Sequence, residues 1–288
     1  MPDGSGDRMV ASLDKPLTPR NGAPLVMLIH GLTGCQDSYY VLNSTLFWLR
    51  RGHSVLRLNL RGAGPSRPLC GDQYHAGRSA DLRAVLAALD PQLLANGVVA
   101  IGYSLGGNVL LKFLGEEGEN CDVKFAATVS APLDLAATSK RFHRARNRIY
   151  LRWLLSRMKQ ESLAPGAHLS EAERTAIKAT RSVWAFDEVF VAPRNGYAGA
   201  MDYYERCSGG RFLGHIFTPT LLIHSLDDPW IPADAYVEFD DMSNPCVTVR
   251  LSKRGGHVGF HGRGSPMPWH DQSIGAWLDR LWGLKSGY

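Results

Sequence analysis

Long hydrophobic runs are missing from this chain of 288 residues. A membrane-spanning helix needs about 20 consecutive apolar residues, and no stretch reaches that length. The first 22 residues are polar and are interrupted by glycine and proline, so they lack the apolar centre of a secretory signal. We therefore expect a cytoplasmic protein.

Cysteine is scarce, and its spacing carries no metal or redox signature. The five cysteines form no Cys-x-x-Cys pair and no zinc-type spacing with histidine; they are Cys35, Cys70, Cys121, Cys207 and Cys246. An odd number of isolated cysteines is typical of a reducing compartment. We expect no metal ion and no cofactor. A nucleic-acid recognition motif is also absent, so we expect no nucleic-acid partner.

Repeats and low-complexity tracts are absent as well, and this favours a single domain. With 44% hydrophobic residues, the chain is long enough to bury one large core. Strand-like and helix-like stretches alternate along it, except in a helix-rich insertion from about residue 134 to residue 218. We expect one domain over residues 1–288, with a core formed by 1–133 and 219–288 and a helical cap formed by the insertion.

The most informative feature that is present is the run Gly-Tyr-Ser-Leu-Gly-Gly at residues 102–107. It follows an apolar stretch, Val98 to Ile101, and precedes a helix-like stretch, Asn108 to Gly115. A strand, a sharp turn and a helix with serine at the apex are typical of the nucleophile elbow of serine hydrolases. Glycines accompany the serine because so tight a turn leaves no room for a Cβ atom. The pattern predicts that Ser104 is a nucleophile.

Two further motifs precede the elbow in the order that the α/β-hydrolase fold predicts. One apolar stretch runs into His30 and Gly31, and a second runs into a glycine-rich turn at residues 61–66. In this fold, a backbone N–H from the loop after the first of these strands joins the N–H that follows the nucleophile, and the two stabilise the oxyanion. We expect Leu32 and Leu105 to supply these N–H groups.

A nucleophilic serine needs a histidine base, and the base needs an acid that holds its tautomer. The strand-like stretch 220–224 is followed by two candidate acids, Asp227 and Asp228. Analogy with other hydrolases favours Asp228, because of its spacing from a small residue and from a following proline. Asp227 is then interpreted as a cap or turn residue of a helix that starts near Ala233. Asp134 is a weaker alternative acid, since a turn or helix cap explains it better.

The base is expected in the loop after the last strand-like stretch, 246–251. This loop carries Gly-Gly-His-Val-Gly at residues 255–259. Glycines beside a histidine suit a side chain that must reach over the elbow, so we predict that His257 is the base. His261 is the nearby competitor.

Six phrases of the sequence together resemble the YheT-like branch of α/β-hydrolases. They are His-Gly-Leu-Thr-Gly at 30–34, Asn-Leu-Arg-Gly at 59–62, Gly-Tyr-Ser-Leu-Gly-Gly-Asn at 102–108, Phe-Asp-Glu at 186–188, Asp-Tyr-Tyr at 202–204 and Asp-Asp-Pro at 227–229. The resemblance covers residues 24 to 280. It implies an α/β-hydrolase fold, that is, a mostly parallel sheet flanked by helices with a helical cap insertion. It also implies an esterase or acyl hydrolase with Ser104, Asp228 and His257 as its catalytic residues.

The residues and the resemblance together predict a serine esterase that cleaves carboxylic esters through an acyl-enzyme. The substrate is expected to be a small-molecule or lipid ester. A phospholipase or thioesterase with the same triad is the alternative. A non-catalytic binding protein on a hydrolase fold is less favoured, because loss of catalysis usually alters a triad residue or an elbow glycine, and all are present here.

The predicted cap is unusually basic. Between Lys140 and Lys159 there are eight Lys or Arg residues and no acidic residue. On one continuous helix, the positions that would share a stripe are Arg141, Arg144, Arg148, Arg152 and Lys159, with Phe142, Ile149, Tyr150, Trp153 and Leu154 on the remaining face. The simplest interpretation is a solvated basic face opposite an apolar face that packs on the body. The alternative is peripheral contact with an anionic membrane through Arg141, Arg144, Arg148 and Arg152.

Overall fold

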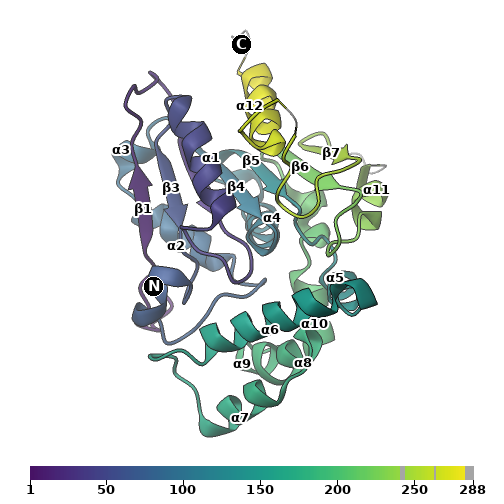
Figure 1. The fold of residues 1–288 in the computed structure, drawn as a ribbon. Helices are drawn as coiled ribbons and strands as arrows, with labels where there is room; N and C mark the ends of the chain where they lie inside the picture. The colour runs from purple at the N-terminus through teal and green to yellow at the C-terminus, as the bar shows by residue number, and fades with distance from the viewer. Residues whose placement is uncertain (241–243, 263, 283–288) are drawn as a thin grey trace.

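The computed structural model describes residues 1–240, 244–262 and 264–282. At its centre lies a seven-stranded sheet in the order β1-β3-β2-β4-β5-β6-β7 (Figure 1). The strands are β1 (Ala11–Asp14), β2 (Leu25–Ile29), β3 (Val55–Leu58), β4 (Val98–Tyr103), β5 (Val123–Val129), β6 (Thr220–Ser225) and β7 (Val247–Ser252). Strand β1 pairs antiparallel with β3, and the remaining described pairs are parallel. The prediction of a mostly parallel sheet is confirmed.

The central strands are apolar because helices cover both faces of the sheet. All residues of β2, β4 and β6 are buried. Successive side chains of a strand point to opposite faces, so Val26 and Leu28 join one hydrophobic cluster, and Met27 and Ile29 join another. A parallel sheet buried in this way reads in the sequence as continuous apolar runs.

Two layers of helices enclose the sheet (Figure 1). On one face, α1 (Tyr39–Arg50) and α12 (Trp269–Leu281) meet through Phe47, Trp48 and Trp277. The other face is covered by α2 (Ala80–Ala88), α4 (Leu105–Glu117) and α11 (Asp234–Asp240). Short helices occupy the connections, namely η1 (Gly64–Leu69), α3 (Pro91–Leu94) and η2 (Gly118–Asn120).

The segment 134–218, which we call the cap, joins β5 to β6 and lies at one end of the sheet (Figure 1). Its helices are α5 (Leu135–Phe142), η3 (Ala145–Asn147), α6 (Arg148–Ser162), α7 (Glu171–Ala179), α8 (Val183–Phe186), the π-helical turn η4 (Asp187–Val191), α9 (Ala192–Arg194), α10 (Ala200–Cys207) and η5 (Gly209–His215). A hydrophobic cluster of its own holds the cap together; it includes Phe142, Leu154, Ile177, Phe186 and Tyr203. The cap therefore packs as a layer against the carboxyl ends of the strands.

The basic segment of the cap is not one helix, so the prediction of a single five-residue stripe was wrong. Helix α5 ends at Phe142, and α6 begins only at Arg148. In the intervening turn, the Asn147 side chain donates hydrogen bonds to the carbonyls of Arg141 (3.0 Å) and Pro229 (2.9 Å). These bonds to the turn and to the body favour two helices over one.

Two members of the expected stripe are engaged inside the protein. The Arg141 guanidinium donates to the backbone carbonyl of Asp228 at 3.1 Å, and the Lys159 ammonium donates to the carbonyls of Lys178 and Thr180. The side chains of Arg144, Arg148 and Arg152 are exposed.

The apolar side of α6 also departs from the prediction. Ile149 is 85% exposed and Trp153 is 53% exposed, so neither packs on the body as expected. Helix α6 therefore presents hydrophobic and cationic side chains to solvent together.

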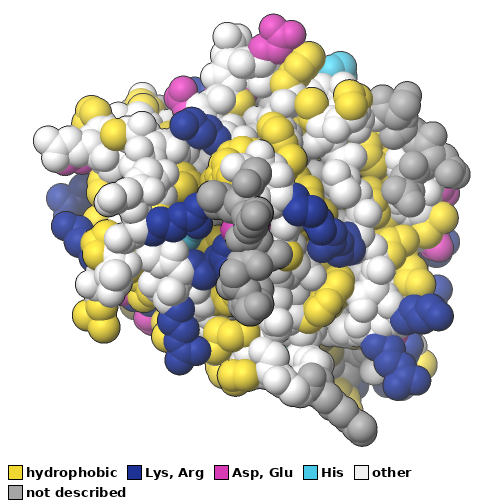
Figure 2. All heavy atoms as spheres, turned by 90° about the horizontal axis from the view of Figure 1, so that it is seen from above, with side chains coloured by type: hydrophobic (Ala, Val, Ile, Leu, Met, Phe, Trp, Pro, Cys, Tyr) yellow, Lys and Arg dark blue, Asp and Glu magenta, His cyan; other side chains and the backbone are white. Residues whose placement is uncertain are grey.

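No helix in the described ranges is both long and apolar enough to span a membrane. Figure 2 views the end of the molecule away from the cap, where Lys and Arg side chains lie in separate small groups among hydrophobic and uncharged ones.

Candidate active site

The nucleophile elbow predicted from the sequence is present at the carboxyl end of β4. Ser104 follows Tyr103, the last residue of the strand, and precedes Leu105, the first residue of α4. Its backbone has φ 49° and ψ −122°, which an L-residue rarely adopts. Such strain persists only where the surrounding structure imposes it, and here it holds the serine at the apex of the turn.

The elbow glycines are required because backbone atoms pass very close to them. A Cβ atom at Gly106 would lie 2.3 Å from the His30 carbonyl oxygen, and one at Gly102 would lie 2.6 Å from the Gly107 Cα. Both distances are far below van der Waals contact, so a side chain would force the strand and the helix apart. The steric reason for glycine at these positions is confirmed.

The structure brings His257 onto Ser104. The imidazole Nε2 lies 3.0 Å from the Ser104 Oγ, and the loop that carries it follows β7, as the sequence predicts. The residue after it, Val258, has φ 53°, which is strained for a β-branched side chain. His261, the competitor, is exposed, and its ring lies beside that of Tyr39.

Asp228 lies on the other side of the imidazole. Its Oδ2 is 2.8 Å from the Nδ1 of His257, and its Oδ1 accepts hydrogen bonds from the backbone N–H groups of Trp230 (2.8 Å) and Ile231 (3.0 Å). Burial alone would raise the pKa of this carboxyl, but the charge of His257 and these hydrogen bonds hold the pKa below its ordinary value. Asp228 is therefore an ionised, fully buried partner for the histidine.

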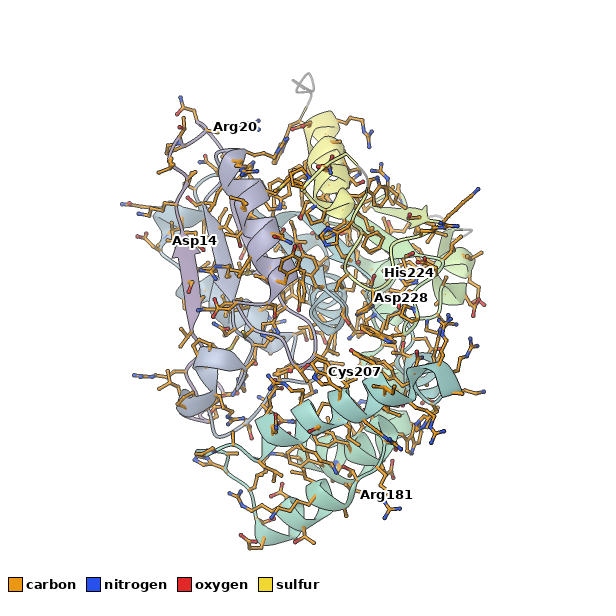
Figure 3. The ribbon with its side chains drawn as sticks, in the orientation of Figure 1. Asp14, Arg20, Arg181, Cys207, His224 and Asp228 are labelled. Atoms are coloured by element: carbon orange, nitrogen blue, oxygen red, sulfur yellow. The ribbon has the colours of Figure 1, made fainter. Side chains whose placement is uncertain are left out.

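A second histidine lies beneath Asp228 and was not singled out from the sequence. Figure 3 shows His224 and Asp228 near the end of the sheet that faces the cap. Burial lowers the pKa of His224 to about 4, so it is neutral, and its ring stacks on Tyr236 with centroids 4.2 Å apart. Its Nδ1 lies 4.0 Å from the Asp228 Oδ2, beyond hydrogen-bond distance, so it does not replace His257 as the partner of the carboxylate.

Asp227 has a different role from the one predicted. Helix α11 begins at Asp234, and Asp227 does not cap it. Instead its Oδ1 accepts hydrogen bonds from the N–H groups of Gly255 (3.0 Å) and Gly256 (2.8 Å), immediately before His257. The acid loop and the histidine loop are thus tied together by the aspartate next to the acid. The alternative acid, Asp134, accepts from the N–H of Ala137 and caps α5, as its simpler interpretation predicts.

Two backbone N–H groups beside Ser104 are free to bind an anion. In the loop after β2, the N–H groups of Gly31, Thr33 and Gly34 donate to Tyr40, Tyr74 and Gly31 respectively. Over the described ranges, the N–H groups of Leu32 and Leu105 have no protein acceptor, and both residues line the cavity that contains Ser104. These are the two residues expected to form the oxyanion hole.

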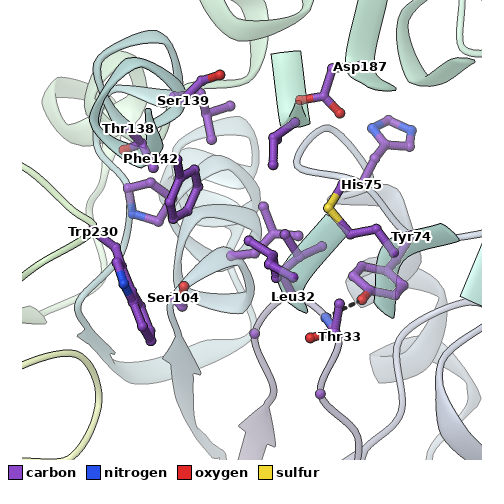
Figure 4. Close-up of a pocket in the computed structure, with 18 of the residues that line it drawn as sticks. Leu32, Thr33, Tyr74, His75, Ser104, Thr138, Ser139, Phe142, Asp187 and Trp230 are labelled. Carbon is purple, nitrogen blue, oxygen red and sulfur yellow. Dashed lines mark hydrogen bonds between the residues drawn. The ribbon is translucent and has the colours of Figure 1, made fainter. Parts of the chain in front are cut away.

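A cavity of about 450 Å³ lies between Ser104 and the cap. Figure 4 shows Ser104 at its floor, with Trp230, Phe142 and Thr138 on one side and Tyr74, His75 and Asp187 on the other. Tyr150 of α6 stacks on Trp230 with ring centroids 3.6 Å apart, and the Trp230 ring lies 4.6 Å from that of His257. An aromatic side chain of the cap, Tyr150, therefore packs against the tryptophan that lies beside His257.

The wall also contains polar residues that the sequence did not single out. The Tyr74 hydroxyl accepts a hydrogen bond from the N–H of Thr33 (2.6 Å) and donates one to Glu161 of α6 (3.0 Å), which links the cap to the loop that carries Leu32. Burial raises the pKa of Glu161 to about 7. Tyr74 and Glu161 are 87 positions apart in the chain, so no local pattern could have paired them.

This arrangement defines a class of protein. A serine at a strained turn, an imidazole hydrogen-bonded to it and to a buried carboxylate, and two free N–H groups are what acyl transfer requires. The sequence profile of the alpha/beta hydrolase fold family matches residues 24–263. The chain belongs to this family and is a hydrolase of the α/β-hydrolase superfamily.

Within that family, the chain is similar to YheT of Escherichia coli (strain K12), a candidate esterase by its name, with 32% identity over 91% of this chain and 78% of YheT. The expected YheT-like membership is confirmed. Phospholipase ABHD3 of Bos taurus is 28% identical over 82% of this chain, which spans 58% of that protein's length. The structure of Est1E from Butyrivibrio proteoclasticus with bound ferulic acid has a TM-score of 0.63, at 15% identity over 98% of both chains. This last likeness concerns the fold.

Proposed function

We propose that this protein is a serine esterase that cleaves carboxylic esters through an acyl-enzyme. The observation that carries the proposal is the continuous line from the Ser104 Oγ to the His257 Nε2 (3.0 Å) and from the His257 Nδ1 to the Asp228 Oδ2 (2.8 Å). Both distances lie within the range over which protons are exchanged in hydrogen bonds. The names of the relatives, an esterase and a phospholipase, are consistent with this chemistry.

Each residue has one task in the proposed reaction. The His257 Nε2 takes the hydroxyl proton of Ser104 as its oxygen attacks the ester carbonyl, and the leaving alcohol then receives that proton. Asp228 holds the proton on Nδ1 and stabilises the imidazolium that forms. The tetrahedral oxyanion accepts hydrogen bonds from the N–H groups of Leu32 and Leu105. Water then attacks the acyl-Ser104 ester with His257 again as the base, which releases the acid and restores the enzyme.

The cavity favours a substrate with an apolar part. Most of the side chains that line it are aliphatic or aromatic, and they include Leu32, Leu135, Phe142, Leu154 and Phe186. A phospholipase or thioesterase with the same residues is the second candidate, which the phospholipase among the relatives favours. A non-catalytic binding protein is the least favoured, since the strained elbow and its glycines are intact.

We also propose that α6 contacts anionic membrane surfaces. Exposed Arg144, Arg148 and Arg152 lie in the same segment as the exposed Ile149 and Trp153. Cationic and hydrophobic side chains on one helix suit the interface of an anionic bilayer. Trp153 also lines the cavity, so a membrane-bound protein would present its cavity to lipid. Arg141 is left out of this contact because it is bound to the carbonyl of Asp228.

The test of the esterase is covalent labelling followed by turnover. A fluorophosphonate probe is expected to modify Ser104, identified by peptide mass spectrometry, and the wild-type protein should hydrolyse p-nitrophenyl esters. Ser104→Ala should lose both properties while its melting temperature stays near that of the wild type, because alanine fits where the serine side chain lies. Probe labelling elsewhere, or turnover by Ser104→Ala within about tenfold of wild type, would refute the serine mechanism.

A further inference from the structure

The inner wall of the cavity contains a carboxyl group that the proposed hydrolysis does not use. Asp187, the first residue of the π-helical turn η4, lines the cavity and is only 7% exposed. It belongs to the Phe-Asp-Glu phrase at 186–188, one of the six phrases on which the resemblance to YheT-like hydrolases rests, and it is not one of the proposed catalytic residues. Turns of π-helix are rare and occur frequently at functional sites.

Only one of the two carboxyl oxygens of Asp187 has a partner. The Tyr204 hydroxyl donates to Oδ2 at 2.5 Å, and the same hydroxyl lies 3.3 Å from that of Ser139. Across the ranges that the structure describes, no protein donor reaches Oδ1. Figure 4 shows Asp187 on the side of the cavity away from Trp230. Oδ1 is therefore open to the cavity, where it is available to a hydrogen-bond donor of a bound molecule.

Among the described residues that line the cavity, no positively charged side chain compensates the Asp187 carboxylate. The cavity-lining residues include the carboxyls of Asp187 and Glu161 but neither Lys nor Arg. Glu161 already accepts from Tyr74, so its position is explained by the loop that it holds. Burial raises the pKa of Asp187 to about 7 in spite of the hydrogen bond from Tyr204. At neutral pH its carboxyl group therefore exists both in the ionised form, which accepts hydrogen bonds, and in the protonated form, which also donates one.

A plain aliphatic chain fits such a wall poorly. Contact with a methylene group would remove Oδ1 from water without giving it a hydrogen-bond donor, which is unfavourable. A hydroxyl group fits it well, because a hydroxyl both donates and accepts. It would donate to the ionised Asp187 carboxylate or accept from its protonated form, while Ser139 contacts the Tyr204 hydroxyl that orients the carboxyl.

We propose that Asp187, together with Tyr204 and Ser139, forms a subsite that binds a hydroxyl group of the substrate at a distance from the scissile ester. The proposal rests on the proposed esterase function and narrows it, since the preferred substrate is a hydroxyl-bearing ester rather than a plain fatty ester. The motif residues then have a reason to occur together: Phe-Asp-Glu supplies the acceptor, and Asp-Tyr-Tyr supplies the tyrosine that orients it.

The experiment compares matched substrate pairs, one for each side of the ester. On the acyl side, p-nitrophenyl esters of a medium-chain acid are used with and without a terminal hydroxyl. On the alcohol side, the monoacylglycerol and the ethyl ester of one acid are used. We expect wild-type kcat/KM to favour the hydroxyl-bearing member of at least one pair by about tenfold or more, as sites built to bind a hydroxyl reject analogues that lack it.

The variants assign this preference to the subsite. Asp187→Leu should abolish the ratio within the pair, Tyr204→Phe should reduce it, and Asp187→Asn should retain part of it, because an amide still accepts. Asp202→Asn is the matched control. Asp202 lies in the Asp-Tyr-Tyr phrase with Tyr204, but its carboxyl accepts a hydrogen bond from the N–H of Ala198, and the residue does not line the cavity. A merely structural Asp187 would change the rates on both members of a pair equally and leave the ratio unchanged.

Equal ratios in wild type and Asp187→Asn for both pairs would overturn the proposal, even if Asp187→Leu does not fold. A binding measurement separates this result from failure of the esterase itself. Calorimetry on Ser104→Ala protein compares a long-chain diol with the alkanol of the same length, and the diol is expected to bind at least about fivefold more tightly. If the two bind equally, the subsite is absent whatever the reaction is.

Discussion

The sheet and the cap contribute to the site in different ways. The sheet supplies reactive groups on short loops at the ends of β2, β4, β6 and β7, and each group is fixed by backbone geometry or by backbone hydrogen bonds. The cap supplies walls made of side chains from helices, and those side chains are fixed by one another, as Tyr204 fixes Asp187. In the proposed reaction, the loops of the sheet therefore carry out the chemistry, and the side chains of the cap select the substrate.

Because of this difference, we expect substitutions in the two regions to have different effects on the proposed reaction. Among the contacts that join the two regions, three involve the acid loop: Arg141 to the Asp228 carbonyl, Asn147 to the Pro229 carbonyl, and Tyr150 on Trp230. A fourth, from Tyr74 to Glu161, joins the cap to the loop that carries Leu32. Changes in the sheet loops should abolish turnover, whereas changes in the cap should alter which substrate or surface is preferred.

The largest effect is expected at the acid. Asp228→Asn should lower kcat by about 10⁴, because an amide neither holds the productive tautomer of His257 nor stabilises the imidazolium. Asp227→Asn should cost only about tenfold, since the amide oxygen still accepts from Gly255 and Gly256. The two variants are compared by steady-state kinetics at equal folded fraction. A greater loss in Asp227→Asn than in Asp228→Asn would reverse the assignment.

The next largest effect concerns the stability of the nucleophile elbow. Gly106→Ala places a Cβ atom 2.3 Å from a backbone oxygen, so we expect the free energy of unfolding to fall by about 2–4 kcal/mol. Gly214→Ala in the cap is the control, because no atom lies within 4 Å of the added Cβ. Urea unfolding of both variants measures the difference. Similar stabilities would mean that the elbow is not rigid.

A smaller effect should separate surface binding from chemistry. Replacing Arg144, Arg148 and Arg152 by Glu should weaken association with anionic vesicles by about 100-fold or more at low salt, at about 1 kcal/mol per cation. Hydrolysis of a water-soluble short-chain ester should stay near the wild-type rate. The control makes the same charge change at Arg50, Lys124 and Arg280, which are exposed and lie outside the cap. If wild-type protein does not sediment with anionic vesicles at low salt, the membrane contact is wrong.

The smallest expected effect is a pH dependence of the protein's stability that arises from Asp187 in the cap. Burial holds the pKa of Asp187 at about 7 in the folded protein, whereas an unfolded aspartate titrates near 3.9. The folded state therefore binds the extra proton between these values, and the contribution of Asp187 to stability decreases as the pH rises through that range. Asp187→Asn should gain a few degrees of melting temperature relative to wild type between about pH 5 and about pH 8. Calorimetry gives the melting temperature of both proteins as a function of pH. If the two pH profiles are parallel, the raised pKa of Asp187 is contradicted. Asp202→Asn, at a half-exposed carboxyl whose pKa is lowered rather than raised, should run parallel to wild type between about pH 5 and about pH 8.

The frame of the site was predictable from sequence for a physical reason. Ser104 and its glycines are close together in the sequence, because the steric limits of one tight turn require glycine on both sides of the serine. His257 and Asp228 were found because each follows a buried strand, and buried parallel strands are continuous apolar runs. Asp227 was misread, because its partners lie in another loop, 28 and 29 positions away.

The cap was harder to predict because its contacts join distant segments. The break between α5 and α6 contains neither glycine nor proline, and bonds from Asn147 to Arg141 and to Pro229 accompany it. The Phe-Asp-Glu and Asp-Tyr-Tyr phrases were visible, but no pattern in the sequence showed that Asp187 would meet Tyr204 beside a cavity. Only the folded packing of helices reveals such a pair.

The strained backbone at Ser104 and Val258 has a consequence for laboratory evolution. Both residues hold positive φ angles that glycine would adopt without strain. A population selected for heat resistance alone would therefore gain by acquiring glycine at either position. At position 104 the proposed nucleophile would be lost, and at position 258 the loop that carries His257 would gain freedom to move. Such lineages would outlast the parent at high temperature and would lose its chemistry, so a thermal screen of this protein needs turnover as a second criterion.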